Sequence, residues 1–243
     1  MRAMLEIIKP PRTLWCDFPD VLIHASESAV KQHPAYKAAK SGHGLSATAL
    51  VNDTMSELQN QRLADTLKGH TPILVSAHAY EREGINAIPE AFAVEISKAL
   101  GWPADTTVAQ INVVAHTGAD GFSRLARQAE FAGAVQAGRE YVLVDDFVGM
   151  GGTLANLKGH IESQGGKVLA AVSLTGKPHS AKLALSPERL HELRLKHGTE
   201  LENWWLGRFA HAFDALTESE ARYLARTEAA DTIRNRIVAA EQA

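Results

Sequence analysis

The sequence lacks most of the features that mark specialised protein classes. It has a single cysteine, Cys16, so an internal disulfide and a cysteine-rich metal site are both excluded. Aromatic residues make up 6% of the 243 residues, and no apolar run approaches the roughly 20 residues that span a bilayer. Glu6 and Lys9 interrupt the apolar residues of the N-terminus, which is atypical of a secretory signal. We therefore expect a cytoplasmic protein that has no contact with a membrane.

The sequence also has no excess of positive charge. Lys and Arg number 25 against 28 Asp and Glu, a formal net charge of −3. Non-specific binding to nucleic acid depends on a basic surface that neutralises phosphates. We therefore expect no general nucleic-acid binding.

Strand-like and helix-like segments alternate in the middle of the chain. Buried-strand patterns occur at 72–77, 106–114, 141–144 and 168–174, and helical patterns at 90–100 and 152–163. Strands that alternate with helices indicate βαβ units. We predict an α/β fold with an open, mostly parallel sheet and helices on both faces.

The segments before and after this region differ from it in their predicted secondary structure. Residues 1–71 are rich in loops and then helical from about 45 to 67, whereas residues 179–243 look all-helical. Ser186-Pro187 is typical of a helix start, and Thr217 to Glu220 fits a capping box. We therefore predict a core at 72–178 with an N-terminal extension at 1–71 and a C-terminal helical extension at 179–243.

The segment that carries chemistry is YVLVDDFVGMGGTL, residues 141–154. A buried strand delivers two adjacent carboxylates, Asp145 and Asp146, and a glycine-rich turn then opens into a helix. Ligands bind at this edge of open α/β sheets. Glycines let consecutive backbone N–H groups surround an anion, and the helix N-terminus adds favourable charge. The carboxylates suit the hydroxyl pair of a ribose or a hydrated Mg²⁺. The unit therefore predicts a ligand with a phosphate beside a diol or a metal.

Other phosphate-binding motifs fit this segment less well. A P-loop requires Gly-Lys-Ser/Thr, and no lysine follows these glycines. A GxGxxG fingerprint that starts at Gly149 meets Leu154 at its third glycine. A phospho-receiver domain carries its acidic pair after the first strand, whereas this pair follows the third predicted strand.

VLVDDFVGMGGT resembles the ribose-phosphate signature of the type I phosphoribosyltransferases, which use phosphoribosyl pyrophosphate (PRPP). The resemblance covers residues 72–178 and implies that Asp145 and Asp146 hold the ribose, as catalytic residues, and Mg²⁺, in part through water. It implies a short pyrophosphate loop after the first strand and a long mobile lid between the second and third strands, at 115–139, where an ordinary crossover helix is the alternative. The implied site residues are, for the 5′-phosphate, Phe147, Val148, Gly149, Met150, Gly151, Gly152 and Thr153, for pyrophosphate, Ala77, His78, Ala79, Tyr80 and Arg82, and for the lid, Arg124 and Arg127.

The sequence is similar to one branch of this family and differs from the usual family pattern at two places. The stretch 82–86 is similar to one in the competence-associated (ComF-like) branch of the family. Arg127 and Gly133 would correspond to residues in the lid of that branch. Met150 stands where the family has a hydroxyl residue, and losing such a donor costs about 1.5–3 kcal/mol. The lid lacks the lysine expected of an orotate-type enzyme.

The predicted function is transfer of ribose 5-phosphate from PRPP to a nitrogenous base, with release of pyrophosphate. The N-terminal and C-terminal extensions would together form a hood over the site that recognises the base. The alternative is a non-catalytic PRPP or nucleotide sensor, or a partner in a DNA-handling system. The identity of the base and the oligomeric state, a homodimer among the options, stay open.

Residues outside the motif are expected to have mainly structural roles. His78 and His116 follow strand ends, so a pocket role is open for either. Trp204 and Trp205 are expected to pack the core of the C-terminal extension. The arginines at 222, 226, 234 and 236 alternate with acids, among them Glu218 and Glu220, which favours a solvated helix face. Residues 72–178 hold 8 basic and 11 acidic residues, so anion binding there should depend on Mg²⁺.

Overall fold

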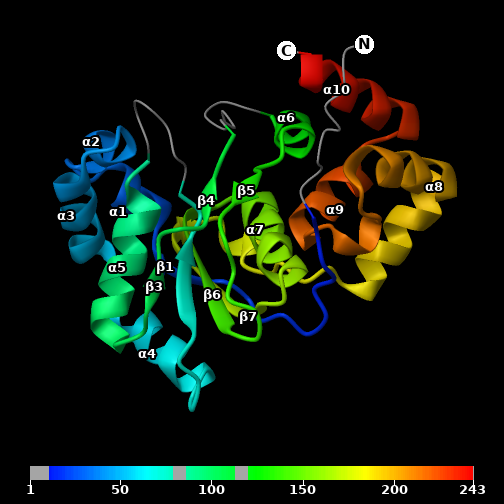
Figure 1. The fold of residues 1–243 in the computed structure, drawn as a ribbon. Helices are drawn as coiled ribbons and strands as arrows, with labels where there is room; N and C mark the ends of the chain where they lie inside the picture. The colour runs from blue at the N-terminus through cyan, green and yellow to red at the C-terminus, as the bar shows by residue number, and fades with distance from the viewer. Residues whose placement is uncertain (1–10, 79–85, 113–119, 243) are drawn as a thin grey trace, which may run out of the picture.

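The chain forms an open parallel sheet between two layers of helices (Figure 1). The computed structural model describes residues 11–78, 86–112 and 120–242. The five strands lie in the order β1-β7-β6-β2-β3, and every neighbouring pair is parallel. Their bounds are β1 Leu22–Ala25, β2 Ile73–Ser76, β3 Ala104–Asp105, β6 Glu140–Val148 and β7 Lys167–Gly176. The predicted α/β fold with a mostly parallel sheet is confirmed.

Alternate residues of the central strand β6 enter two different cores. Val142 and Val144 pack on one face, and Tyr141 and Leu143 on the other. The first face is covered by helices α1 Glu27–Lys31, α2 Tyr36–Lys40, α3 Gly44–Thr54, α4 Glu57–Thr66 and α5 Ile88–Leu100. The second is covered by α7 Gly152–Ser163 and by Trp15 and Phe18 of the N-terminal segment. Helices thus cover both faces, as predicted.

The C-terminal extension forms a third apolar cluster of its own. Its elements are η1 Pro178–Ser180, α8 Pro187–Phe209, η2 Phe213–Ala215, α9 Glu218–Arg226 and α10 Ala230–Gln242. Trp205 is fully buried among its aromatic neighbours, which confirms the predicted packing role. Ser186 caps α8, and the predicted capping box of α9 is present. Phe122 and Leu125 of α6, Gly121–Ala126, complete this cluster, so the predicted lid segment packs on the C-terminal extension.

The second predicted strand, 106–114, is wrong as a member of the main sheet. The strand that pairs there is β3, and it ends at Asp105, whose carboxylate accepts hydrogen bonds from the backbone N–H and the hydroxyl of Thr107. This turn redirects the chain. Strand β4, Ala109–Gln110, instead pairs antiparallel with β5, Phe131–Ala132, in a separate ribbon.

The N-terminal segment contributes a strand to the main sheet. Strand β1 lies before residue 72 and pairs with β7, so the sheet draws a strand from outside the predicted core range. The helical stretch predicted for 45–67 is two helices, because Met55 is extended and Ser56 caps α4. The domain bounds 1–71, 72–178 and 179–243 remain predictions. Among the described helices, none combines the length and apolar character needed to cross a bilayer.

Candidate functional site

The glycine-rich loop turns the chain from β6 into α7 at the carboxyl edge of the sheet. Gly151 has a φ of 83°, in the left-handed region, and a Cβ there would lie 2.4 Å from Cδ2 of Leu183. The first helical hydrogen bond runs from the N–H of Ala155 to the carbonyl of Gly151. The N–H groups of Gly152, Thr153 and Leu154 therefore have no partner within the helix.

The carbonyl groups of this loop are held by the C-terminal extension. The hydroxyl of Thr217 donates to the carbonyl of Met150 at 2.5 Å, and the hydroxyl of Ser180 donates to that of Gly149. The C=O and N–H of a trans peptide point in opposite directions. The N–H groups of Met150 and Gly151 therefore point away from these hydroxyls.

Five consecutive N–H groups are thus available to a ligand. Within the part of the chain that the structure describes, those of residues 150–154 donate no hydrogen bond. Such an array at a helix N-terminus suits an anion.

Asp145 and Asp146 occupy different environments although they are adjacent. Asp145 is buried, with 7% of its surface exposed, and its Oδ1 accepts a hydrogen bond from the N–H of Asp146 at 2.8 Å. Burial, and secondarily the charge of Asp146, raises the pKa of the Asp145 carboxyl well above its ordinary value. Asp146 is the more accessible of the two. A ligand hydroxyl can therefore reach Asp146 more readily than Asp145.

Lys40 of α2 is a site residue that the sequence did not reveal. Its Nζ lies 2.7 Å from Oδ2 of Asp146. Burial acts to lower the pKa of Lys40, but Asp146 outweighs it, so this pKa is raised and the ammonium stays charged. The two residues are 106 positions apart, and no local pattern connects them.

The end of β2 is fixed by hydrogen bonds. The N–H of Ala77 donates to the carbonyl of Val144 at 2.8 Å. His78 is buried, and its Nδ1 lies 2.8 Å from the hydroxyl of Ser76. The first contact holds Ala77 beside β6, and the second ties the ring of His78 back to β2. The other predicted members of this loop, and the second histidine, lie outside the described residues: Ala79, Tyr80, Arg82 and His116.

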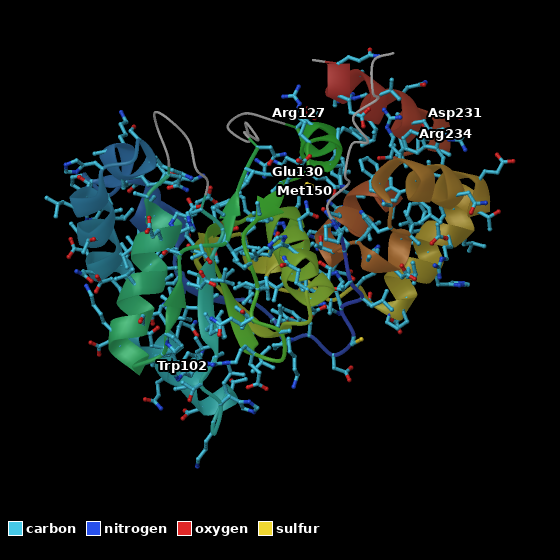
Figure 2. The ribbon with its side chains drawn as sticks, viewed as in Figure 1. Trp102, Arg127, Glu130, Met150, Asp231 and Arg234 are labelled. Carbon is cyan, nitrogen blue, oxygen red and sulfur yellow. The ribbon has the colours of Figure 1, made fainter. Side chains whose placement is uncertain are left out.

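The two predicted lid arginines have different neighbours. An Nη atom of Arg124 lies 2.8 Å from the position that a Cβ of Gly149 would occupy. The Nε of Arg127 instead donates to the carbonyl of Ala240 in α10 at 3.1 Å (Figure 2). The structure therefore brings Arg124 to the glycine-rich loop and ties Arg127 to the C-terminal helix.

Met150 packs against the cluster of the C-terminal extension (Figure 2). Phe122 and Leu125 of α6 belong to the same cluster. An apolar side chain at this position therefore anchors the loop to the helices, where a hydroxyl would have no such contact.

A buried ion pair lies beside the first turn of α7. Arg12 and Glu220 each have 2% of the side chain exposed, and their closest approach is 2.6 Å. A Cβ on Gly152 would lie 2.7 Å from Oε1 of Glu220. The predicted solvated face of α9 is therefore wrong for Glu220, and also for Glu218, which is buried and accepts hydrogen bonds from Ser186.

In the described part of the site, the side chains that could hold a metal are those of the acidic pair. No group of three or more His, Cys, Asp or Glu side chains that could hold a metal ion occurs among the described residues. Mg²⁺ in sites that act on phosphates commonly takes one or two carboxylates, with waters and substrate phosphates as its other ligands. Asp145 and Asp146 fit that role.

Comparisons with known proteins find two relatives by sequence, and no protein-family model matches the chain. The Escherichia coli protein named "Protein TraN" is 37% identical over 237 residues, which are 98% of this chain and 53% of that protein. An uncharacterized protein of Haemophilus influenzae is 36% identical over 151 residues, which are 62% of this chain and 34% of that protein. The chain spans about half the length, or less, of these curated relatives.

Among solved structures, the chain is similar to phosphoribosyltransferases. The adenine phosphoribosyltransferase of Thermoanaerobacter pseudethanolicus matches with a TM-score of 0.34 and 18% identity, over 56% of this chain and 85% of that one. The Leishmania donovani enzyme matches with a TM-score of 0.35 and 16% identity, over 63% of this chain and 57% of that one.

Proposed function

We propose that the chain binds PRPP at the carboxyl edge of β6 and transfers its ribose 5-phosphate to a nitrogenous base. The observation that carries this proposal is the junction of β6 with α7. There an acidic pair, Asp145 and Asp146, lies next to the N–H groups of residues 150–154, which have no partner in the described structure. A ligand with a 5′-phosphate and a neighbouring diol has the matching chemistry.

Each part of the site has a distinct role in this proposal. The N–H groups of the loop bind the 5′-phosphate, and Arg124 adds positive charge beside Gly149. Asp146 accepts hydrogen bonds from the ribose hydroxyls, and Lys40 fixes its carboxylate. Asp145 stays buried and orients Asp146 through the backbone hydrogen bond between them.

Mg²⁺ that accompanies PRPP would be held at Asp145 and Asp146, in part through water, and would neutralise the charge of the departing pyrophosphate. The residues around the site can position the ribose so that a base approaches its anomeric carbon as pyrophosphate leaves.

Titration with PRPP and Mg²⁺ by calorimetry tests binding. The double variant D145N/D146N should lose at least tenfold in affinity, since an amide has no negative charge with which to strengthen the hydrogen bonds from the ribose hydroxyls or to hold Mg²⁺. Asp17 is exposed and has no hydrogen bond among the described residues, so D17N is the matched control and should bind as wild type does. Equal binding by wild type and D145N/D146N would contradict the proposal.

A non-catalytic sensor is the second candidate. Met150 favours it, because the loop side chain that could have donated a hydroxyl instead packs on the helices. Pyrophosphate release across a panel of purine and pyrimidine bases separates the two candidates. Release with one base supports the enzyme, whereas PRPP binding without turnover supports the sensor.

A further inference from the structure

A pocket lies between the glycine-rich loop and the C-terminal extension. Its volume is about 140 Å³, which is room for a group of several non-hydrogen atoms. It is lined by Gly149 and Met150 of the loop, His179 of η1, and Ser219, Arg222, Tyr223 and Arg226 of α9. Its lining contains two arginines and no acidic residue.

The two arginines of this pocket differ from the other arginines of the C-terminal extension. Those at positions 189, 194, 208, 234 and 236 each form an ion pair with an Asp or Glu. Within the described residues, Arg222 and Arg226 form none. Arg222 donates to the hydroxyl of Ser219 at 2.7 Å, and Arg226 is exposed. Two guanidinium groups that lack carboxylate partners and share a concave surface are suited to an anion.

The pocket lies on the opposite side of the loop from the N–H groups. Ser219 lines it and donates to the hydroxyl of Ser180, which in turn donates to the carbonyl of Gly149. The carbonyl of Met150 is held on the same side by Thr217. The N–H groups of Met150 and Gly151, which belong to the same peptides, point away from these carbonyls. An anion in the pocket would therefore be separate from a 5′-phosphate held by the loop.

We propose that this pocket is a second anion site, which binds the phosphate group of a small phosphate-bearing ligand through Arg222 and Arg226. Phosphate suits the planar guanidinium group, which can donate two parallel hydrogen bonds to its oxygens. The chain of hydrogen bonds from Arg222 through Ser219 and Ser180 to Gly149 links the pocket to the loop. The pocket shares Gly149 and Met150 with the loop of the proposed function, but the two arginines that would hold the anion belong to neither that loop nor the acidic pair.

Calorimetric titration of the full chain with inorganic phosphate and, separately, with ribose 5-phosphate tests the proposal. R222Q/R226Q should weaken phosphate binding at the pocket by about a hundredfold, or about tenfold for each charged donor removed. The single variant R226Q should lose about tenfold. Because Arg226 is exposed and has no described partner, this variant should fold as wild type does. R62Q is the matched control, since Arg62 is an exposed arginine on α4, and should change nothing.

The acidic pair separates this proposal from the proposed function. D145N/D146N should keep the phosphate affinity that R222Q/R226Q loses, whereas loss of PRPP binding by D145N/D146N bears only on the transfer reaction. If inorganic phosphate and ribose 5-phosphate bind with equal affinity, the pocket is a site for free phosphate. If ribose 5-phosphate binds more tightly, the pocket is a site for a phosphate monoester. Phosphate binding that is the same in R226Q, R222Q/R226Q and wild type would overturn the proposal, as would no binding by wild type.

Discussion

Lys40 and Asp146 form an ion pair of 2.7 Å that joins the N-terminal helices to the acidic end of the central strand. The lysine places a positive charge beside two adjacent carboxylates, one of which is buried. An anionic ligand that approaches this edge therefore meets a reduced negative charge.

Substitution of Lys40 by Met should weaken PRPP binding by about tenfold. The variant removes the cation that offsets the acidic pair, and the repulsion between the ligand phosphates and the carboxylates grows. Calorimetry with Mg²⁺ present measures the change. The control is K37M on the same helix, because Lys37 is exposed and its side chain has no described partner. If K40M bound PRPP as tightly as K37M does, the lysine would have no electrostatic role at the site.

D145N should be more stable than wild type at neutral pH. Burial raises the pKa of Asp145 in the folded chain, so that stability is full below the ordinary carboxyl pKa and is lost as pH rises through the raised value. An Asn in this position carries no charge and avoids that loss, while its oxygen can still accept from the N–H of Asp146.

Thermal unfolding between pH 3 and pH 8 measures this effect. The midpoint of D145N should exceed that of wild type by several degrees at pH 7, and the difference should shrink towards pH 3. The exposed Asp17 again provides the control through D17N. A difference that stays constant over the whole range would mean that ionisation of Asp145 is not its cause.

Thr217 connects the start of α9 to the glycine-rich loop. T217V removes both the cap to the N–H of Glu220 and the hydrogen bond to the carbonyl of Met150, and should cost about 1–2 kcal/mol in the free energy of unfolding. Amide hydrogen exchange at Ala155, whose N–H donates to the carbonyl of Gly151, should accelerate as well. Thr227 caps the end of the same helix, and among the described residues its hydroxyl bonds only to the carbonyl of Tyr223, so T227V should leave that exchange unchanged. Unchanged exchange in T217V would show that the loop does not need this contact.

The buried pair of Arg12 and Glu220 should be sensitive to loss of one partner. R12M leaves the Glu220 carboxylate buried without its cation, so the free energy of unfolding should fall by about 3–5 kcal/mol. Denaturant unfolding measures it. R194M breaks a more exposed pair with Glu202 and should cost less than about 1 kcal/mol. Similar losses in R12M and R194M would contradict the expected effect of burial.

Local sequence signals predicted the elements around the site. The glycine-rich turn places α7 at Gly152–Ser163 as expected, and the buried apolar run gives β6, which extends further than predicted. These signals work because strand burial and helix termination depend on nearby residues. The second predicted strand failed where the side chain of Asp105 turns the backbone, a contact that apolar periodicity does not register.

Contacts between distant segments could not be predicted from the sequence. Lys40 and Arg12 lie in the N-terminal segment, yet they pair with Asp146 and Glu220. A charged residue of one segment has many candidate partners in another, and only the tertiary fold selects one. The burial of Glu220 was missed for the same reason, because the composition of α9 alone resembles that of a solvated helix.

The pairing of β1 with β7 has a consequence for the order in which the chain is made. Thr175 of β7 donates to the carbonyl of Ala25 of β1, and these residues are 150 positions apart. During synthesis from the N-terminus, Val30, Leu50 and Leu63 are made long before the strands that they cover. Contacts of such sequence separation slow folding. The apolar faces of the first helices therefore lack their cover from β6 and β7 until both strands have been synthesised.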